Sequence, residues 1–178
     1  INFPYWKLDY KFKCSSTENI LNDYLKKNDL SKMKPLAFFS KEQFDGKGQY
    51  GRKWFSPRGG IWLSAAYPIF SNNFSSEIFS ISIAYYLSQM LLRESIKVTI
   101  KWPNDIFYDS KKLIGFIPRV VTRGDKVIYV RVGIGMNLNN RTPNEGISLS
   151  RILNKKPLNE SYWSSKLLKA ITKSIFRN

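Results

Sequence analysis

The spacing of apolar residues along the chain predicts three helices. The first starts at Ser16 or Thr17 and runs to about Asn28. Either hydroxyl can cap it by accepting a hydrogen bond from a free backbone N–H. The second spans residues 75–93 and the third residues 160–176, and both keep apolar side chains at helical intervals. The chain therefore has three helices with one apolar face each.

Short runs rich in β-branched and aromatic residues predict strands between these helices. The runs are residues 36–40, 61–67, 98–102, 112–121 and 126–138. The turn residues at 123–125, Arg-Gly-Asp, favour a hairpin between the last two. The 178 residues fit one domain. We therefore expect an α+β fold in which helices back a mixed, largely antiparallel sheet.

The residue types that are missing exclude several kinds of chemistry. The chain has no His and a single Cys, Cys14, so His-based triads, multi-cysteine metal sites and intrachain disulfides are excluded. No apolar run is long enough to cross a bilayer and no signal peptide opens the chain. These patterns predict a cytoplasmic protein without membrane contact.

The charge is strongly unbalanced, with 29 Lys and Arg against 13 Asp and Glu and a net charge of +16. Such a field attracts polyanions or an acidic protein partner. Cations together with 5 Trp, 10 Tyr and 12 Phe also suit a nucleic-acid-binding module. The cations are spread along the chain without a recognised nucleic-acid-binding motif, which weakens that alternative.

Three segments have compositions suited to ligand binding. In GKGQYGRKWFSP, residues 46–57, glycines let backbone amides approach a ligand and cations neutralise phosphate, although surface turns can have the same composition. In KWPND, residues 101–105, Pro103 ends a strand and turns Asn104 and Asp105 outward, which suits nucleotide and Mg²⁺ or only a surface ion pair. In GIGMNLN, residues 133–139, glycines inside a strand indicate close approach of a ligand or a β-bulge.

Together these segments resemble the biotin protein ligase family in order and approximate separation. KKLIG follows KWPND, Ile147-Ser148-Leu149 follows GIGMNLN, and Ser16-Thr17 and Gln43 also fit. KWPND is the specific element, because lipoate ligases and octanoyl transferases share the family's fold but not this pentapeptide. The resemblance implies a class II synthetase-like catalytic domain that joins biotin to ATP, with Mg²⁺, and transfers biotin to a lysine of a biotin carboxyl carrier protein.

The same resemblance implies a role for individual residues. Lys112, in KKLIG, takes the position of the catalytic lysine, with Lys47 of the glycine loop as a second catalytic cation. Each of these positions, and each position that would contact biotin or ATP, can instead be a helix cap, a core aromatic residue or a surface cation. The positions that would contact biotin are Ser16, Thr17, Gln43, Gly46, Gly48, Trp54, Trp62, Ser64, Lys112, Gly115, Gly133 and Gly135. Those that would contact ATP are Lys47, Gln49, Arg52, Lys53, Trp54, Asn104, Asp105 and Asn137, with Asp105 and Asn137 also holding Mg²⁺.

The sequence departs from the family at three places. Gln49 stands where a cation is usual, and Glu18 stands where Asn is common. Residues 116–119 replace an aliphatic run, and Pro118 is expected to interrupt a strand that many members use to dimerise. Formation of a homodimer therefore stays open.

The resemblance also bears on domain organisation. No helix-turn-helix domain precedes Ser16, and the chain stops in a helix at Asn178 before the family's small C-terminal β-barrel. We therefore expect a single catalytic domain over residues 1–178 that does not bind DNA. A lipoate ligase or octanoyl transferase of the same fold is an alternative. The transferase that works through a thioester needs a cysteine near its substrate channel, and Cys14 lies in another region of the sequence.

Overall fold

The computed structural model describes residues 5–28, 34–71 and 74–176. These residues form one seven-stranded sheet in the order β1-β2-β3-β7-β6-β5-β4. The strands are β1 (Lys7–Cys14), β2 (Leu36–Gln43), β3 (Ile61–Ser71), β4 (Thr99–Lys101), β5 (Asp105–Tyr108), β6 (Lys111–Arg123) and β7 (Lys126–Met136). All neighbouring pairs are antiparallel except β1 and β2, which are parallel. The expected mixed, largely antiparallel sheet is confirmed.

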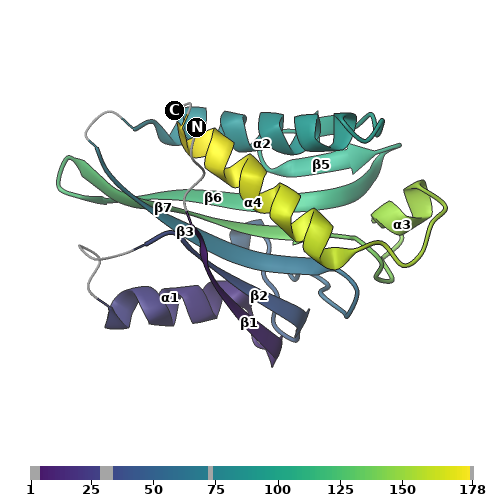
Figure 1. The fold of residues 1–178 in the computed structure, drawn as a ribbon, viewed down its shortest axis with the longest axis horizontal. Helices are drawn as coiled ribbons and strands as arrows, with labels where there is room; N and C mark the ends of the chain where they lie inside the picture. Colours follow the sequence, from purple (N-terminus) through teal and green to yellow (C-terminus); the bar gives the residue numbers. More distant parts are fainter. Residues whose placement is uncertain (1–4, 29–33, 72–73, 177–178) are drawn as a thin grey trace.

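Helices cover both faces of this sheet (Figure 1). The helices are α1 (Thr17–Lys27), α2 (Ser76–Leu92), α3 (Leu149–Ile152), α4 (Glu160–Phe176) and the short 3-10 turn η2 (Gln49–Gly51). Helices α2 and α4 lie side by side on one face, and α1 lies on the other (Figure 1). Within the described residues, no helix is long and apolar enough to cross a membrane.

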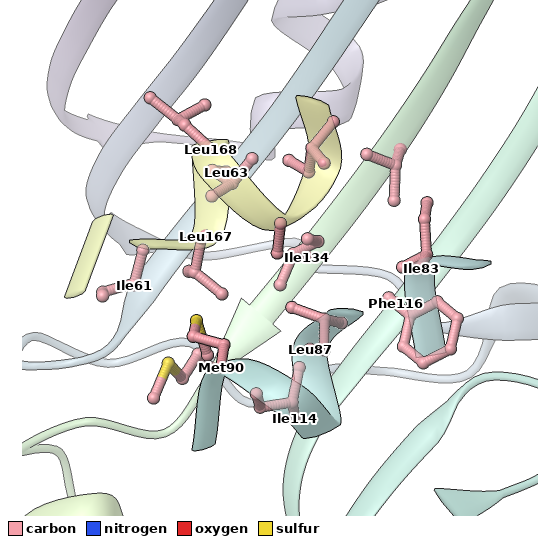
Figure 2. Packing of buried hydrophobic residues seen from close by; sticks show 14 of the residues in the cluster. Ile61, Leu63, Ile83, Leu87, Met90, Ile114, Phe116, Ile134, Leu167 and Leu168 are labelled. Atoms are coloured by element: carbon pink, nitrogen blue, oxygen red, sulfur yellow. The ribbon is translucent and has the colours of Figure 1, made fainter. Parts of the chain in front are cut away.

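The main core fills the space between the sheet and the α2–α4 layer. Figure 2 shows Ile83 and Leu87 of α2 and Leu167 of α4 packed against Ile114 and Ile134 of the sheet. A smaller apolar cluster lies on the opposite face, where Leu21 and Leu25 of α1 contact the sheet. This smaller cluster fixes the position of α1, so that the first turn of the helix stands over β3 and β7.

The three expected helices are confirmed with small shifts at their ends. Ser16 is the N-cap of α1, because its Oγ accepts a hydrogen bond from the Asn19 amide at 3.1 Å. Ser75 caps α2 in the same way through the amide of Ile78. The hairpin turn at 123–125 is also confirmed, since Arg123 pairs with Lys126.

Besides the short turn η2, three elements were not expected from the pattern: β1, β5 and α3. β5 has only four residues, which is too short for an alternating pattern to be visible. β1 is an edge strand whose residues are almost all exposed, so it has no alternation of apolar and polar residues. α3 has only four residues, which is too short for a helical period to be visible.

The expectation that Pro118 interrupts a strand is wrong. Pro118 lies inside β6 and pairs with Val132 of β7. The pairing of β6 with β5 ends at Gly115, so the second edge of β6 is unpaired at Pro118 among the described residues. Proline lacks an N–H donor and is tolerated where a strand edge needs no partner.

Candidate functional site

A cavity of about 650 Å³ opens on the α1 side of the sheet. Its walls come from the start of α1, the glycine loop at 46–54, and the facing strands β3, β6 and β7. Of the residues expected at a ligand site, those that line the cavity are Ser16, Thr17, Gln43, Lys47, Gly48, Gln49, Trp54, Ser64, Asn104, Asp105, Lys112, Gly115, Gly133 and Gly135. The fold therefore brings together motifs that are far apart in sequence.

One end of the cavity is polar and buried. The backbone amide and Oγ1 of Thr17 both donate to Oε1 of Gln43, at 2.7 and 3.1 Å. Ser64 Oγ lies 2.9 Å from Thr17 Oγ1. A hydroxyl has one proton, so Thr17 Oγ1 can donate to Gln43 only if Ser64 donates to Thr17. Ser64 therefore presents lone pairs to the cavity and accepts hydrogen bonds from a ligand.

The middle of the cavity is formed by Trp54 lying across two glycines. Atoms of the indole lie 2.8 Å from the position of a Cβ on Gly115 and 2.4 Å from that on Gly135. Any larger residue at either position would displace the ring. The Trp54 Nε1 is buried without a hydrogen-bond partner among the described residues. A ligand oxygen in the cavity would satisfy this donor.

An ion pair stands at the opposite end. Lys112 Nζ lies 2.7 Å from Asp105 Oδ1 and 4.8 Å from the centroid of the Trp54 ring. The two strands are paired in this region, with Asp105 opposite Gly115. Lys111 does not line the cavity, which agrees with alternation of side chains along a strand. Of the two adjacent lysines of β6, Lys112 is therefore the one that faces the cavity.

The glycine loop is folded back on itself as a narrow hairpin. The Gly48 amide donates to the Arg52 carbonyl at 2.6 Å, and the Trp54 amide donates to the Gly46 carbonyl at 2.8 Å. Lys47 lies at the cavity and forms an ion pair with Asp45 at 3.3 Å. The expected ATP contacts Arg52 and Lys53 are exposed and do not line the cavity.

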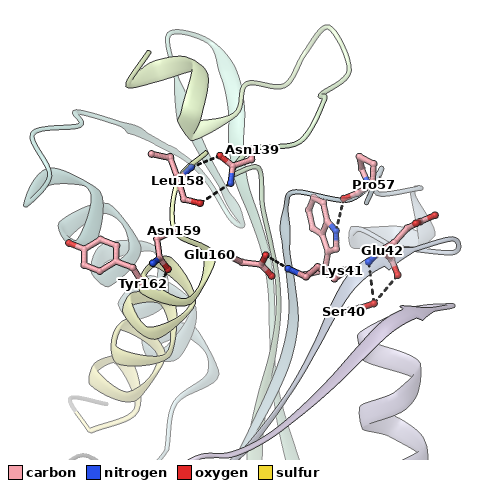
Figure 3. A network of polar contacts seen from close by, with 10 residues as sticks. Ser40, Lys41, Glu42, Pro57, Asn139, Leu158, Asn159, Glu160 and Tyr162 are labelled. Atoms are coloured by element: carbon pink, nitrogen blue, oxygen red, sulfur yellow. Dashed lines mark hydrogen bonds and ion pairs between the residues drawn. The ribbon is translucent and has the colours of Figure 1, made fainter. Parts of the chain in front are cut away.

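Two further residues lie elsewhere than expected. Gly46 lies just outside the cavity wall, where a Cβ would meet Ser56 Oγ at 2.6 Å. Trp62 is fully buried, does not line the cavity and donates from Nε1 to the carbonyl of Pro57. Figure 3 labels Pro57 and also draws the Lys41–Glu160 ion pair, which joins β2 to α4. Gly46 and Trp62 support the walls of the cavity instead of touching its contents.

Asn137 also differs from the expectation. Its Nδ2 donates to the Lys112 carbonyl at 3.2 Å and its Oδ1 accepts from Asn140 at 2.9 Å. The side chain is buried and does not line the cavity. Among the described residues, no group of three His, Cys, Asp or Glu side chains could hold a metal ion. Asn137 fixes the backbone of Lys112. The expectation that Asp105 and Asn137 hold Mg²⁺ stays a prediction.

The cavity contains residues that the motifs did not indicate. Glu18 and Asn22 reach it from successive turns of α1, Tyr50 from the tip of the glycine loop and Arg119 from β6. Of these, Glu18 and Arg119 stood at departures from the family, and Tyr50 lay inside the glycine-loop motif, but none of the four was expected at the ligand. Their place at the cavity depends on how α1 and the loop pack over the sheet.

The fold and site define a class of enzyme when compared with known proteins. The sequence matches the model of the biotin/lipoate A/B protein ligase family over residues 11–137. The structure superposes on the biotin protein ligase from Aquifex aeolicus in complex with biotin and ATP with a TM-score of 0.75 and 27% identity, covering 96% of this chain and 71% of that one. The chain belongs to the biotin/lipoate A/B protein ligase family.

Relatives within this family include biotin ligases of bacteria and animals. The bifunctional ligase/repressor BirA of Escherichia coli is 28% identical over 113 residues, which are 62% of this chain and 35% of that protein. The biotin–protein ligase of Homo sapiens is 27% identical over 154 residues, which are 79% of this chain and 21% of that protein. The chain thus spans about a third or less of the length of these relatives.

Proposed function

We propose that this protein is a biotin protein ligase, which activates biotin with ATP and transfers it to a lysine of an acceptor protein. The observation that best supports this is the position of Lys112, whose ammonium faces a cavity with a buried hydrogen-bonding end. The cavity thus offers a polar, hydrogen-bonding subsite at one end and the Lys112 ammonium at the other. A carboxylic acid with a polar ring has these same two ends.

The biotin ring would lie at the polar end. Buried polar groups of a ligand need partners, and Thr17, Gln43 and Ser64 supply fixed ones. The apolar body of the ligand would extend along Gly115 and Gly135 beside Trp54. This orientation directs the carboxylate toward Lys112.

Adenylation joins two anions. A carboxylate oxygen attacks the α-phosphate of ATP, the bond to pyrophosphate breaks, and biotinyl-adenylate forms. Lys112 would stabilise the negative charge shared by the two groups, with Lys47 of the glycine loop as a further cation at the cavity. Mg²⁺ would enter with ATP, bound by phosphate oxygens, and Asp105 is a carboxylate at the cavity that could join them.

The second step transfers biotin to an acceptor. The uncharged amine of an acceptor lysine attacks the carbonyl carbon of the adenylate, and AMP leaves. We infer that the acceptor is a biotin carboxyl carrier domain with an acidic surface, because the net charge of +16 would speed its approach.

The proposal is tested by mixing the protein with biotin and MgATP and searching for biotinyl-adenylate by mass spectrometry. The expected result is equimolar adenylate and pyrophosphate. If a folded protein forms no adenylate with biotin, the proposed function is rejected. A parallel reaction with lipoate tests the other branch of the family. Salt-dependent binding to oligonucleotides without biotin binding would favour a nucleic-acid-binding module instead.

A further inference from the structure

An ion pair closes the polar end of the cavity and has no part in the chemistry described above. Glu18, in the first turn of α1, has its Oε1 3.5 Å from Nη1 of Arg131 on β7. The same Nη1 donates a hydrogen bond to Asn22 Oδ1, one turn further along α1. Arg131 thereby connects two cavity-lining residues of α1 to the sheet.

Arg131 does not itself line the cavity but holds two residues that do. Its side chain is only 12% exposed, against 31% for Glu18, and its Nε is buried without a partner among the described residues. Burying a cation with an unsatisfied donor costs free energy. Glu18 and Asn22 both engage Nη1, so they leave the Nε donor without a partner among the described residues.

The two oxygens of the Glu18 carboxylate have different environments. Oε1 faces Arg131, whereas Oε2 stands over Gly133, 3.7 Å from the position of a Cβ on that residue. Ser64 Oγ lies at the same distance, 3.7 Å, from the same position. No hydrogen bond or ion pair within the described residues engages Oε2. Above Gly133, therefore, a carboxylate oxygen and a hydroxyl oxygen both face the cavity.

Both of these oxygens can only accept. A carboxylate has no proton to donate, and the proton of Ser64 is directed at Thr17 by the hydrogen-bond chain that ends at Gln43. Asn, the residue common in the family at position 18, can donate as well as accept. Glu18 restricts this end of the cavity to ligands that bring N–H donors.

We propose that Glu18, positioned by Arg131, determines specificity for the acid by accepting a hydrogen bond from a ring N–H of biotin. This inference rests on the proposed function and adds a contact to it. A ureido ring has two N–H groups, which match Glu18 Oε2 and Ser64 Oγ. The dithiolane of lipoate and the chain of octanoate have none, so binding either acid would leave both acceptors dehydrated and unpaired.

The test compares biotin with its two mono-N-methyl derivatives, each of which lacks one ring N–H. Affinities are measured by titration calorimetry for the unchanged protein, for Glu18→Ala and for the isosteric Glu18→Gln. The unchanged protein should bind one of the N-methyl derivatives at least about tenfold more weakly than biotin, as expected for losing a hydrogen bond to a charged group. In both Glu18 variants, the ratio of the Kd of that derivative to the Kd of biotin should fall to about threefold or less.

Asp23→Asn is the matched control, because it removes the same charge from an exposed position of the same helix. In this control, the ratio of the two Kd values should be the same as in the unchanged protein. A Glu18 variant that also keeps the ratio, or that loses affinity for biotin and for an ATP analogue alike, would show that Glu18 only supports the fold. If the unchanged protein does not bind biotin at all, the proposed function itself fails, and this inference fails with it.

Discussion

Trp54 occupies the space that a side chain at Gly135 would need: its Nε1 lies 2.4 Å from the position of a Cβ on that glycine. Gly115, which pairs with Gly135 across β6 and β7, makes room for the opposite edge of the same ring. The indole thus packs against two glycines on neighbouring strands. Because these glycines have no side chains, the ring can lie on the sheet and shape the cavity.

Replacing Gly135 with Ala should therefore displace Trp54. Overpacking of this kind costs about 1–3 kcal/mol, so we expect biotin affinity to fall about tenfold, with a change in tryptophan fluorescence. Titration calorimetry and fluorescence measure the two effects. Gly124→Ala is the control, because Gly124 lies in the distant β6–β7 turn with no atom within 4 Å of its Cβ position. It should lower stability through its positive φ of 58° but leave biotin affinity unchanged.

Lys112→Ala should slow adenylate formation by at least about a hundredfold, the usual cost of losing one donor to a transition state. Biotin affinity should change much less, because the ring is held at the other end of the cavity. Single-turnover measurement of pyrophosphate release tests the rate. Lys111→Ala should stay within about threefold of the unchanged protein, since its side chain does not line the cavity. The reverse pattern would contradict the assignment of Lys112.

Gln49 faces the cavity from the glycine loop where a cation is usual in the family. A neutral amide makes weaker hydrogen bonds to phosphate than a guanidinium, by about a factor of two. Gln49→Arg should therefore slow the release of biotinyl-adenylate into solution, measured by trapping free adenylate after a single turnover. An unchanged release rate would mean that Lys47 already retains the adenylate.

The net charge of +16 predicts that ionic strength affects the transfer of biotin to the acceptor more than it affects the formation of the adenylate. Transfer of biotin to an acidic carrier domain should slow as ionic strength rises, because screening shortens the range of attraction to about 8 Å near physiological salt. Adenylate formation, with both substrates inside the cavity, should change less. Acceptor kinetics that do not depend on salt would remove this role for the charge.

The ion pair between β2 and α4 predicts a pH dependence of stability. A hydrogen bond to Glu160, at 2.5 Å, raises the pKa of Lys41 above its ordinary value of 10.5. The stabilisation is therefore fully present below pH 10.5 and is lost as pH rises through the higher pKa of the folded state. Lys41 is partly exposed, so its contribution should be less than about 1 kcal/mol. Urea unfolding of Lys41→Met should show a deficit near neutral pH that disappears in strong alkali.

The sequence by itself determined the helices, most strands and the identity of the main motifs. Periodicity is a local property, and it predicted α4 at its observed bounds, Glu160–Phe176. The alternation of side chains along a strand likewise predicted that only one of Lys111 and Lys112 faces the ligand. The exposed edge strand β1 was not identifiable, since nothing in it alternates between water and a core.

Only the tertiary structure decided which motif residues meet. Trp62 and Asn137 were expected to contact the ligands, yet both are buried outside the cavity lining, where each donates a hydrogen bond to a backbone carbonyl. Glu18 stood out in the sequence as a single unusual residue. Its partner Arg131 is more than a hundred positions away, at a separation of 113. Their pairing required α1 to pack over β7, a long-range arrangement that no local pattern specifies.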